Sequence, residues 1–390
     1  MRYNYEKLKI FGTQVMIQAG LEPDEAALFT ENLLYADSRG MGSHGISRLI
    51  NYSKRVKCGV ITPGANAEIV QEAPSVLVID GHNGVGAKIA RQAMDLCVER
   101  AKTTGCCAAT VRNGNHFGAG AFYTKYAAQK GMIAFMVSNS EAAVAPIGGA
   151  KAMLGTNPLG VAVPAKRNDP FDLDMATSVV ARGKVVLAQK EGRKIPLGWA
   201  VDKNGADTTE PDAVLDGGSM LPFGGAKGYA ISLFIDLMCS CLGGALNCRT
   251  TPHFWTDYEH PQDVGYFIIV IDPSKFLPLE EFENRVDDML EEFKNCPPAP
   301  GVKRVLIPGE LEAEKERASM RDGIEISDAV AAEHQAFGCT HIGIGSLPGG
   351  FDKGLAGYQT FAETYRPVGR RLAALGCRLM YHNHHMEFAR

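Results

Sequence analysis

The stretch DSRGMGSHGISRL, residues 37–49, places a histidine and an arginine where one expected helix ends and another begins. Residues 23–35 before it have the apolar spacing of a helix, and glycines then interrupt that spacing. Ser43 is a favoured N-cap residue type, so we expect a second helix to start there and to run through Tyr52. The stretch therefore organises a helical N-terminal segment around a backbone break that carries polar side chains.

His44 and Arg48 are four residues apart, a spacing that would put them on one face of the second helix. An imidazole can pass a proton near neutral pH, and a guanidinium can hold a carboxylate with two parallel hydrogen bonds. The pair suits an enzyme that acts on a 2-hydroxy or 2-oxo acid. The alternative is a plain helix start with a capping serine and a solvated arginine, and the rest of the chain has to decide between the two.

Length, charge and cysteine content restrict the class of protein. A chain of 390 residues exceeds one hydrophobic core, so two or three domains are expected. The net charge of −4 gives no reason to expect nucleic acid or an anionic membrane as a partner. Ten scattered cysteines match neither a zinc spacing nor a disulfide framework. Neither an apolar signal-peptide core nor a stretch of roughly 20 apolar residues is present. We therefore expect a soluble cytoplasmic protein.

Strands alternate with helices in the first half of the chain, which indicates an α/β domain after the helical residues 3–57. The expected elements are a strand at 75–80, a helix at 87–103, a strand at 108–111, a helix from 121 and a strand at 132–138. Further on come short strands and turns from 161, a helix at 228–246, a strand at 264–271 and a helix at 280–294.

Two glycine-bearing stretches follow expected strands and invite a nucleotide-binding interpretation. The glycines at 81, 84 and 86 fall in the order G-x-x-G-x-G, which is not the order of the Rossmann fingerprint. Residues 116–120, HFGAG, open an expected helix, where unpaired amides and the positive end of the helix dipole favour phosphate oxygens. The alternative for HFGAG is a tight strand-to-helix turn with a polar cap.

Three more stretches are unusual for plain scaffolding, although each is a weak signal by itself. GTNPL at 155–159 places a hydroxyl next to an amide, and its alternative is a simple loop. DMATS at 174–178, followed by ARGK, gathers a carboxylate, hydroxyls and cations that could equally form a solvated face. GGAKGY at 224–229 offers Lys227 to a phosphate or to the end of a neighbouring helix.

Taken together and in order, these motifs resemble those of the type-2 malate/L-lactate dehydrogenases, a family that includes L-sulfolactate, ureidoglycolate and 2,3-diketogulonate enzymes. The resemblance covers residues 3–330 and rests on DSRGMGSHGISRL, NHFGAG, GTNPL, DMATS, ARGK, IPLGWA, GGAKGY and VLIPGE. It implies an NAD- or NADP-dependent 2-hydroxyacid dehydrogenase with a non-Rossmann α/β fold and an N-terminal helical segment. It also implies a homodimer with cofactor and substrate near the interface.

The resemblance assigns roles to single residues. His44 would give the proton to the substrate carbonyl oxygen with Ser43 relaying beside it, His116 is the second candidate for this role, and Arg48 would clamp the carboxylate. Thr156, Arg182 and Gly183 would lie on the substrate side. Cofactor contacts would come from His116, Phe117, Gly118, Ala119, Gly120, Asp174, Met175, Ala176, Lys227, Arg304, Pro308 and Gly309. No motif identifies the ribose 2′ position, so NAD and NADP both stay open, as does the identity of the acid.

Hydride transfer to or from a substrate carbon needs a group that moves a proton at the oxygen, and histidine titrates in the right range. We expect the helix N-terminus to lower the pKa of His44 and so to favour the neutral form, which accepts a proton during alcohol oxidation. A bound carboxylate would act in the opposite direction.

Residues 331–390 have a different character and resemble a fragment of the sugar-phosphate isomerase/epimerase family, the xylose-isomerase-like TIM barrels. We expect a strand at 337–345, a helix at 355–375 and a strand at 377–382. The residues that look like metal ligands are His382, His384, His385 and Glu387. Two βα units are far fewer than the eight of a barrel, so a fused or truncated fragment without a metal site is expected. The division would then be 1–72 helical, 73–330 cofactor- and substrate-binding, and 331–390 fragment. The competing readings are a non-catalytic fusion product and a metal-dependent sugar isomerase fragment.

Overall fold

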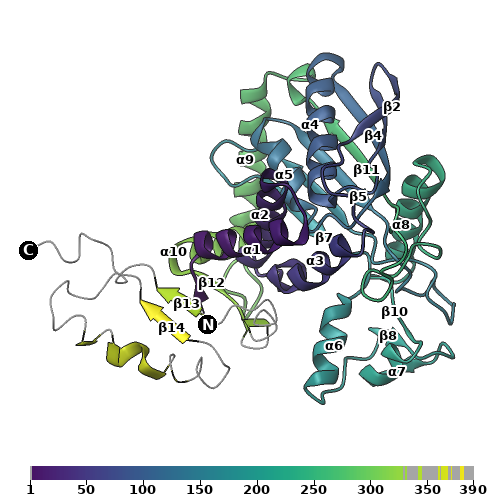
Figure 1. Ribbon diagram of the computed structural model, residues 1–390. Helices are drawn as coiled ribbons and strands as arrows, with labels where there is room; N and C mark the ends of the chain where they lie inside the picture. Colours follow the sequence, from purple (N-terminus) through teal and green to yellow (C-terminus); the bar gives the residue numbers. More distant parts are fainter. Residues whose placement is uncertain are drawn as a thin grey trace, which may run out of the picture. The chain divides into compact units, whose positions relative to one another are not determined.

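A seven-stranded mixed sheet forms the centre of residues Tyr3–Ile324, which make one compact unit of the computed structural model (Figure 1). The structure describes residues 2–327, 330–331, 341–344, 359–360, 362–367, 370 and 378–381. The strand order is β2-β3-β4-β11-β5-β6-β7. The bounds are β2 Glu68–Ala73, β3 Val76–Asp80, β4 Cys106–Gly114, β5 Ile133–Ser138, β6 Leu159–Val163, β7 Phe171–Met175 and β11 Val264–Ile271.

Only one pair of neighbouring strands in this sheet, β3 and β4, runs parallel. Strand β11 comes from far along the chain and inserts between β4 and β5, antiparallel to both, with Ile268 opposite Ala109 on one side and Met136 on the other. A Rossmann sheet is a doubly wound parallel sheet, so this topology excludes that fold. The α/β class expected from the alternating pattern is confirmed.

Helices cover both faces of the sheet. Helices α4 (Gly86–Thr104) and α5 (Ala121–Gln129) pack on one face, where an apolar core includes Ile79, Met94 and Ile268. On the other face, α8 (Ala226–Asp236) continues as the π-helix η3 (Leu237–Leu242). The helix expected at 228–246 is present but ends at Leu242, and it changes its hydrogen-bonding pattern at Leu237.

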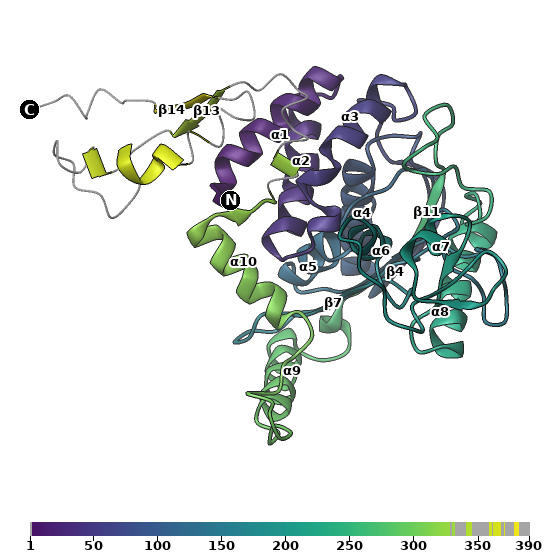
Figure 2. The ribbon, with the colours of Figure 1, turned by 90° about the horizontal axis from the view of Figure 1, so that it is seen from below.

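The N-terminal segment consists of α1 (Tyr5–Ala19), α2 (Pro23–Ser38) and α3 (Leu49–Lys57), which lie together in Figure 2. Asn4 caps α1 by accepting a hydrogen bond from the backbone N–H of Lys7 at 3.2 Å, and Gly20 ends the helix with a φ of 118°. The helix expected from Ser43 is wrong in its start. Two single-turn 3-10 helices, η1 (Gly42–His44) and η2 (Ile46–Arg48), precede α3.

The remaining elements surround this framework. A small sheet of β10 (Ser219–Met220), β8 (Ala200–Val201) and β9 (Asp207–Thr208) packs with α6 (Arg182–Lys190) and α7 (Pro211–Leu215). Further elements are η4 (Pro273–Lys275), α9 (Leu279–Lys294), α10 (Glu310–Asp322), β1 (Arg2–Tyr3) and β12 (Ile324–Glu325). Within the described part of the chain, every helix is too short or too polar to cross a membrane.

Met1–Arg2 and Glu325–Arg390 form the second unit. Its strands β13 (His341–Ile344) and β14 (Arg378–Tyr381) pair in parallel and fall within the two stretches expected as strands. The ligand-like residues of the isomerase resemblance lie outside the described residues; they are His382, His384, His385 and Glu387. The three-part division of the chain stays a prediction, and its first boundary, at residue 72, falls within strand β2.

Candidate active site

The loop between α2 and α3 is shaped by the partly buried carboxylate of Asp37. The Oδ2 atom of Asp37 accepts a hydrogen bond from the backbone N–H of Ile46 at 2.6 Å. A Cβ on Gly45 would lie 1.8 Å from Oδ1 of Asp37, so this position has room for glycine only. The chain therefore turns around Asp37 and forms two short 3-10 helices in place of one continuous α-helix.

Ser43, His44 and Arg48 meet in this loop. Ser43 Oγ lies 3.0 Å from Nδ1 of His44, and the Arg48 Nε–H donates to the backbone carbonyl of Ser43. His44 and Arg48 stand on successive 3-10 turns, and the single helical face expected from their spacing does not exist. The pair nevertheless stays together because the Arg48 side chain folds back onto the backbone beside His44.

His116 comes from the turn after β4 and joins the loop. The His44 and His116 rings stack with centroids 5.6 Å apart. Tyr52 of α3 hydrogen-bonds to Nδ1 of His116, and the backbone N–H of Gly118 donates to the same nitrogen at 3.2 Å. Because that N–H can only donate, Nδ1 of His116 is an acceptor and the ring proton sits on Nε2.

Two aromatic residues that sequence reasoning missed complete this cluster. Phe254 is buried, and its ring centroid lies 5.0 Å from that of His116. The centroid of the Trp255 ring lies 4.2 Å from the guanidinium carbon of Arg48. Such contacts between a guanidinium and an aromatic face are attractive. They follow no local pattern, since residues 250–260 match none of the motifs. Tyr52, which the sequence offered only as a helix residue, is equally part of the site.

Burial sets the protonation of the two histidines. It lowers the pKa of His44 to about 3, and the positive charge of Arg48 lowers this pKa further. Burial and then the charge of Arg48 also hold the pKa of His116 well below its usual value. The lowered pKa of His44 was expected, but it comes from burial and a neighbouring cation, since no regular helix begins at Ser43.

The carboxyl group of Asp37 has the opposite perturbation. Burial raises its pKa to about 7, and the hydrogen bond from Ile46 partly offsets that rise. The loop that carries His44 and Arg48 thus rests on a carboxyl group that titrates near neutrality.

Of the residues expected on the substrate side, Gly183 lies beside the loop that carries His44, whereas Thr156 belongs to a different loop. A Cβ on Gly183 would be 3.8 Å from Cβ of Ser43, so the start of α6 faces η1. Burial lowers the pKa of His253, which immediately precedes Phe254, and the charge of Arg182 also lowers this pKa. Thr156 is held in another loop, where its backbone N–H donates to Ser140 Oγ at 3.1 Å.

The structure brings the HFGAG and DMATS motifs together, but it changes their interpretation. Asp174 Oδ2 accepts the backbone N–H of Ala121 at 2.9 Å, so a carboxylate of the protein already caps the start of α5. That amide therefore has a protein partner, while the expectation that residues 116–120 contact the cofactor stays a prediction. Burial raises the pKa of Asp174 to about 6. Gly118 has a φ of 85°, and a Cβ there would overlap Asn32 Oδ1.

The other expected cofactor residues are more dispersed. Gly309 packs so tightly on Asp172 that a Cβ would lie 2.7 Å from its carbonyl oxygen, which brings the segment with Pro308 to β7. Arg304 is exposed and paired with Glu310 and Glu314. Lys227 is exposed in the first turn of α8. Just before this helix, the backbone N–H of Phe223 donates to the carbonyl of Thr177, which follows β7, so the start of α8 is tied to the end of β7. The other expected cofactor residues lie in two places. Phe117 and Ala119 are buried in the turn before α5, Met175 is the last residue of β7, and Ala176 follows it.

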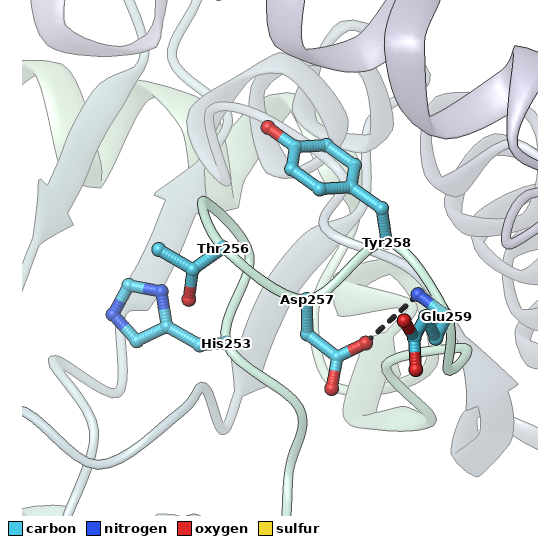
Figure 3. Close-up of a pocket in the computed structure, with 5 residues that line it drawn as sticks. All are labelled: His253, Thr256, Asp257, Tyr258 and Glu259. Carbon is cyan, nitrogen blue, oxygen red and sulfur yellow. Dashed lines mark hydrogen bonds between the residues drawn. The ribbon is translucent and has the colours of Figure 1, made fainter.

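A cavity of about 460 Å³ lies along the segment that contains the aromatic pair (Figure 3). Its lining residues are His253, Thr256, Asp257, Tyr258 and Glu259. The Asp257 carboxylate accepts the backbone N–H of Glu259 at 3.0 Å, which folds the segment into a tight turn. None of these five residues was singled out from the sequence.

Several known dehydrogenases are similar to this chain in sequence. The chain is 40% identical over 323 residues to the L-sulfolactate dehydrogenase of Methanocaldococcus jannaschii, covering 83% of this chain and 91% of that protein. It is 33% identical to the ureidoglycolate dehydrogenase (NAD(+)) of Escherichia coli, with 85% and 94% covered. It is also 33% identical to the (2R)-3-sulfolactate dehydrogenase (NADP(+)) of Chromohalobacter salexigens, with 82% and 92% covered.

The fold agrees as well. The solved structure of the M. jannaschii sulfolactate dehydrogenase superimposes with a TM-score of 0.80 at 37% identity, covering 86% of this chain and 96% of that one. The sequence profile of the malate/L-lactate dehydrogenases matches residues 3–334. The expected non-Rossmann fold of that group is therefore confirmed, and the chain belongs to the malate/L-lactate dehydrogenase family.

Proposed function

We propose that this chain is an NAD(P)-dependent oxidoreductase that interconverts a 2-hydroxy acid and a 2-oxo acid. The observation that carries the proposal is the stacking of neutral His44 and His116 beside the Arg48 guanidinium. It provides a proton acceptor, a hydrogen-bond donor and an anion clamp within one cluster. Family membership and the dehydrogenase names of the relatives support it.

His44 is the better candidate for moving the proton. Its Nδ1 faces Ser43 Oγ, an atom that can either donate or accept, so the ring can change its protonation without losing this partner. His116 has its Nδ1 occupied by two donors and therefore presents an Nε2–H, which can polarise the substrate oxygen. We therefore assign acid-base work to His44, with Ser43 relaying, and substrate orientation to His116.

Arg48 links substrate binding to proton uptake. In the free protein its positive charge helps to keep His44 neutral, the form needed to accept the hydroxyl proton of a 2-hydroxy acid. A substrate carboxylate on Arg48 neutralises that charge and raises the pKa of His44, which favours the protonated form needed to reduce a 2-oxo acid. Thr156, Arg182 and Gly183 are proposed to contact the rest of the substrate.

The residues around β7 fit a nicotinamide dinucleotide. Asp174, a partly buried carboxyl group, can accept from a ribose hydroxyl, and the buried Oδ1 of Asp172 has no hydrogen-bond partner within the described protein. We assign cofactor contacts to residues 116–120, 174–176 and 304–309 and to Lys227. When bound, the nicotinamide supplies or takes up the hydride. Relatives named for NAD(+) and for NADP(+) keep both cofactors as candidates.

We further propose that two copies of the chain form a homodimer through α8 and η3. These helices expose an apolar surface that consists of Ile231, Leu233, Phe234, Leu237 and Leu242. Isolated apolar residues are common on surfaces, but a contiguous row on one helix is typical of an interface. For residues 331–390, we propose a fragment that adds no second activity, because a stretch of this length holds far fewer than the eight βα units of a TIM barrel.

The decisive experiment measures the absorbance of NADH and NADPH with the purified chain and a panel of 2-oxo acids, including pyruvate, oxaloacetate and 3-sulfopyruvate. We expect oxidation of at least one reduced cofactor that depends on one of these acids. Thermal shift with each cofactor alone provides a second readout. Absence of turnover with every acid, together with no shift by either cofactor, would contradict the proposal and favour a non-catalytic fusion product.

A further inference from the structure

Arg55 of α3 is a fully buried cation that the proposed reaction does not use. Its exposed fraction is 0%, and its Nη1 donates to the backbone carbonyls of Phe254 at 3.1 Å and of Asp257 at 2.7 Å. Its Nε and Nη2 atoms have no hydrogen-bond partner within the described residues. A buried guanidinium that hydrogen-bonds to neutral carbonyls and lies 5.3 Å from the centroid of the Phe254 ring is costly, so its presence calls for a role beyond filling space.

The two carbonyls belong to the segment that forms one wall of the candidate site. Asn51, one turn earlier on α3, donates its Nδ2–H to the same Phe254 carbonyl at 3.2 Å and accepts from the Tyr258 hydroxyl at 2.6 Å. Lys54 lies over the Tyr258 ring at 3.8 Å. One helix thus holds residues 254–258 at three points.

The side chains on the held segment reach the reacting groups. Phe254 packs against His116, and Trp255 covers one face of the Arg48 guanidinium. Covering one face leaves the edge of the guanidinium that carries its two Nη groups for a carboxylate, because the Nε–H already donates to the Ser43 carbonyl. The orientation of the anion clamp therefore depends on where Trp255 is placed, and that placement depends on Arg55.

We propose that Arg55 is a positioning residue that fixes Trp255 over Arg48, and that Trp255 determines how the substrate carboxylate is received. The inference rests on the proposed function, because it takes Arg48 as the carboxylate clamp. It predicts that Arg55 affects binding of the acid much more than binding of the nicotinamide.

The kinetic test compares Arg55→Met, which keeps the bulk of the side chain and removes the donors, with Arg55→Lys, which keeps the charge. Lys57→Met, on an exposed position of the same helix, is the matched control. We expect Arg55→Met to raise KM for the 2-oxo acid about tenfold while KM for the reduced nicotinamide stays within about twofold. Arg55→Lys should recover part of the loss, and the control should behave as the original chain.

A spectroscopic test does not depend on turnover. The chain has two tryptophans, so Trp199→Phe leaves Trp255 as the single reporter beside Arg48. In this background, Arg55→Met should increase quenching of Trp255 by acrylamide, and Lys57→Met should not. Titration with a 2-oxo acid should change the emission of Trp255, and this change should need a higher acid concentration in the Arg55→Met variant.

The two proposals fail in different ways. If the unaltered chain oxidises neither cofactor with any acid, the proposed function fails. If it is active but Arg55→Met keeps its KM for the acid and its Trp255 quenching, the positioning role is refuted. An Arg55→Met variant that only loses thermal stability would equally refute it. If that variant does not fold, a comparison of Trp255→Leu with Trp255→Phe tests whether an aromatic ring over Arg48 determines binding of the acid. Equal KM values for the acid in these two variants would overturn the inference.

Discussion

His44 and His116 differ in the partners of their Nδ1 atoms, and this difference should separate their kinetic effects. His44→Ala removes the proposed proton carrier, so we expect turnover to fall roughly 10²–10⁴-fold. His116→Ala should lower turnover less and should raise KM for the acid. Steady-state rates with saturating cofactor measure both, and circular dichroism confirms the fold. Near-normal turnover of the His44 variant would transfer the acid-base role to His116.

Arg48 acts through a planar, bidentate geometry, so loss of charge and loss of shape can be distinguished. Arg48→Lys keeps the charge but cannot offer two parallel N–H groups. We expect both Arg48→Lys and Arg48→Ala to raise KM for the acid, the alanine variant more strongly, with smaller effects on turnover. Initial rates over a range of acid concentrations measure this. An unchanged KM in the alanine variant would show that another cation holds the carboxylate.

Asp37 should make stability depend on pH with a definite sign. Its folded pKa of about 7 lies above the ordinary value of 3.8, so folding binds a proton between these values. The stability from this proton is fully present below about pH 3.8 and is lost as pH rises through about 7. Asp37→Asn cannot ionise and can still accept from Ile46. We therefore expect this variant to unfold at higher denaturant concentration than the original chain at about pH 8, with little difference at about pH 4.

At the scale of elements, the apolar face of α8 should be covered by a second copy of the chain. Phe234 is 48% exposed and lies in the middle of that face. Phe234→Glu places a charge where the partner would pack, so we expect monomers at concentrations that give dimers of the original chain. Sedimentation velocity distinguishes the two states, and Met289→Glu on the exposed face of α9 is the control. A Phe234→Glu variant that remains dimeric would place the interface elsewhere.

The expected elements were most accurate where apolar side chains form a continuous local run. Strand β11, Val264–Ile271, has the bounds expected for the apolar run at 264–271. The start of α3 was wrong because Asp37 binds Ile46 across the loop. A serine of a capping type signals that a helix can begin, but the carboxylate of Asp37, which precedes that serine in the chain, binds the backbone of Ile46 and decides where α3 begins.

At the scale of the whole molecule, Tyr3–Ile324 forms a compact unit that contains every residue assigned to the site. We therefore expect a chain that ends at Val330 to keep its cofactor-dependent thermal shift and its turnover. Measuring the thermal shift and the turnover of this shortened chain beside those of the full chain tests whether the unit Tyr3–Ile324 functions without the residues after 330. Loss of cofactor binding on this truncation would show that residues after 330 support the cofactor site.

The sequence alone was sufficient for the α/β class and the family, because these depend on motifs whose residues are neighbours in the chain, while the roles assigned to residues 43–48 stay predictions. It did not predict the insertion of β11 between β4 and β5, the capping of α5 by Asp174 or the wall of Phe254 and Trp255. Asn51 and Phe254 are 203 residues apart, and no local spacing relates them. Their contact exists because the sheet brings distant segments together, so the surroundings of Arg48 and the lowered pKa of His44 were decided by tertiary packing.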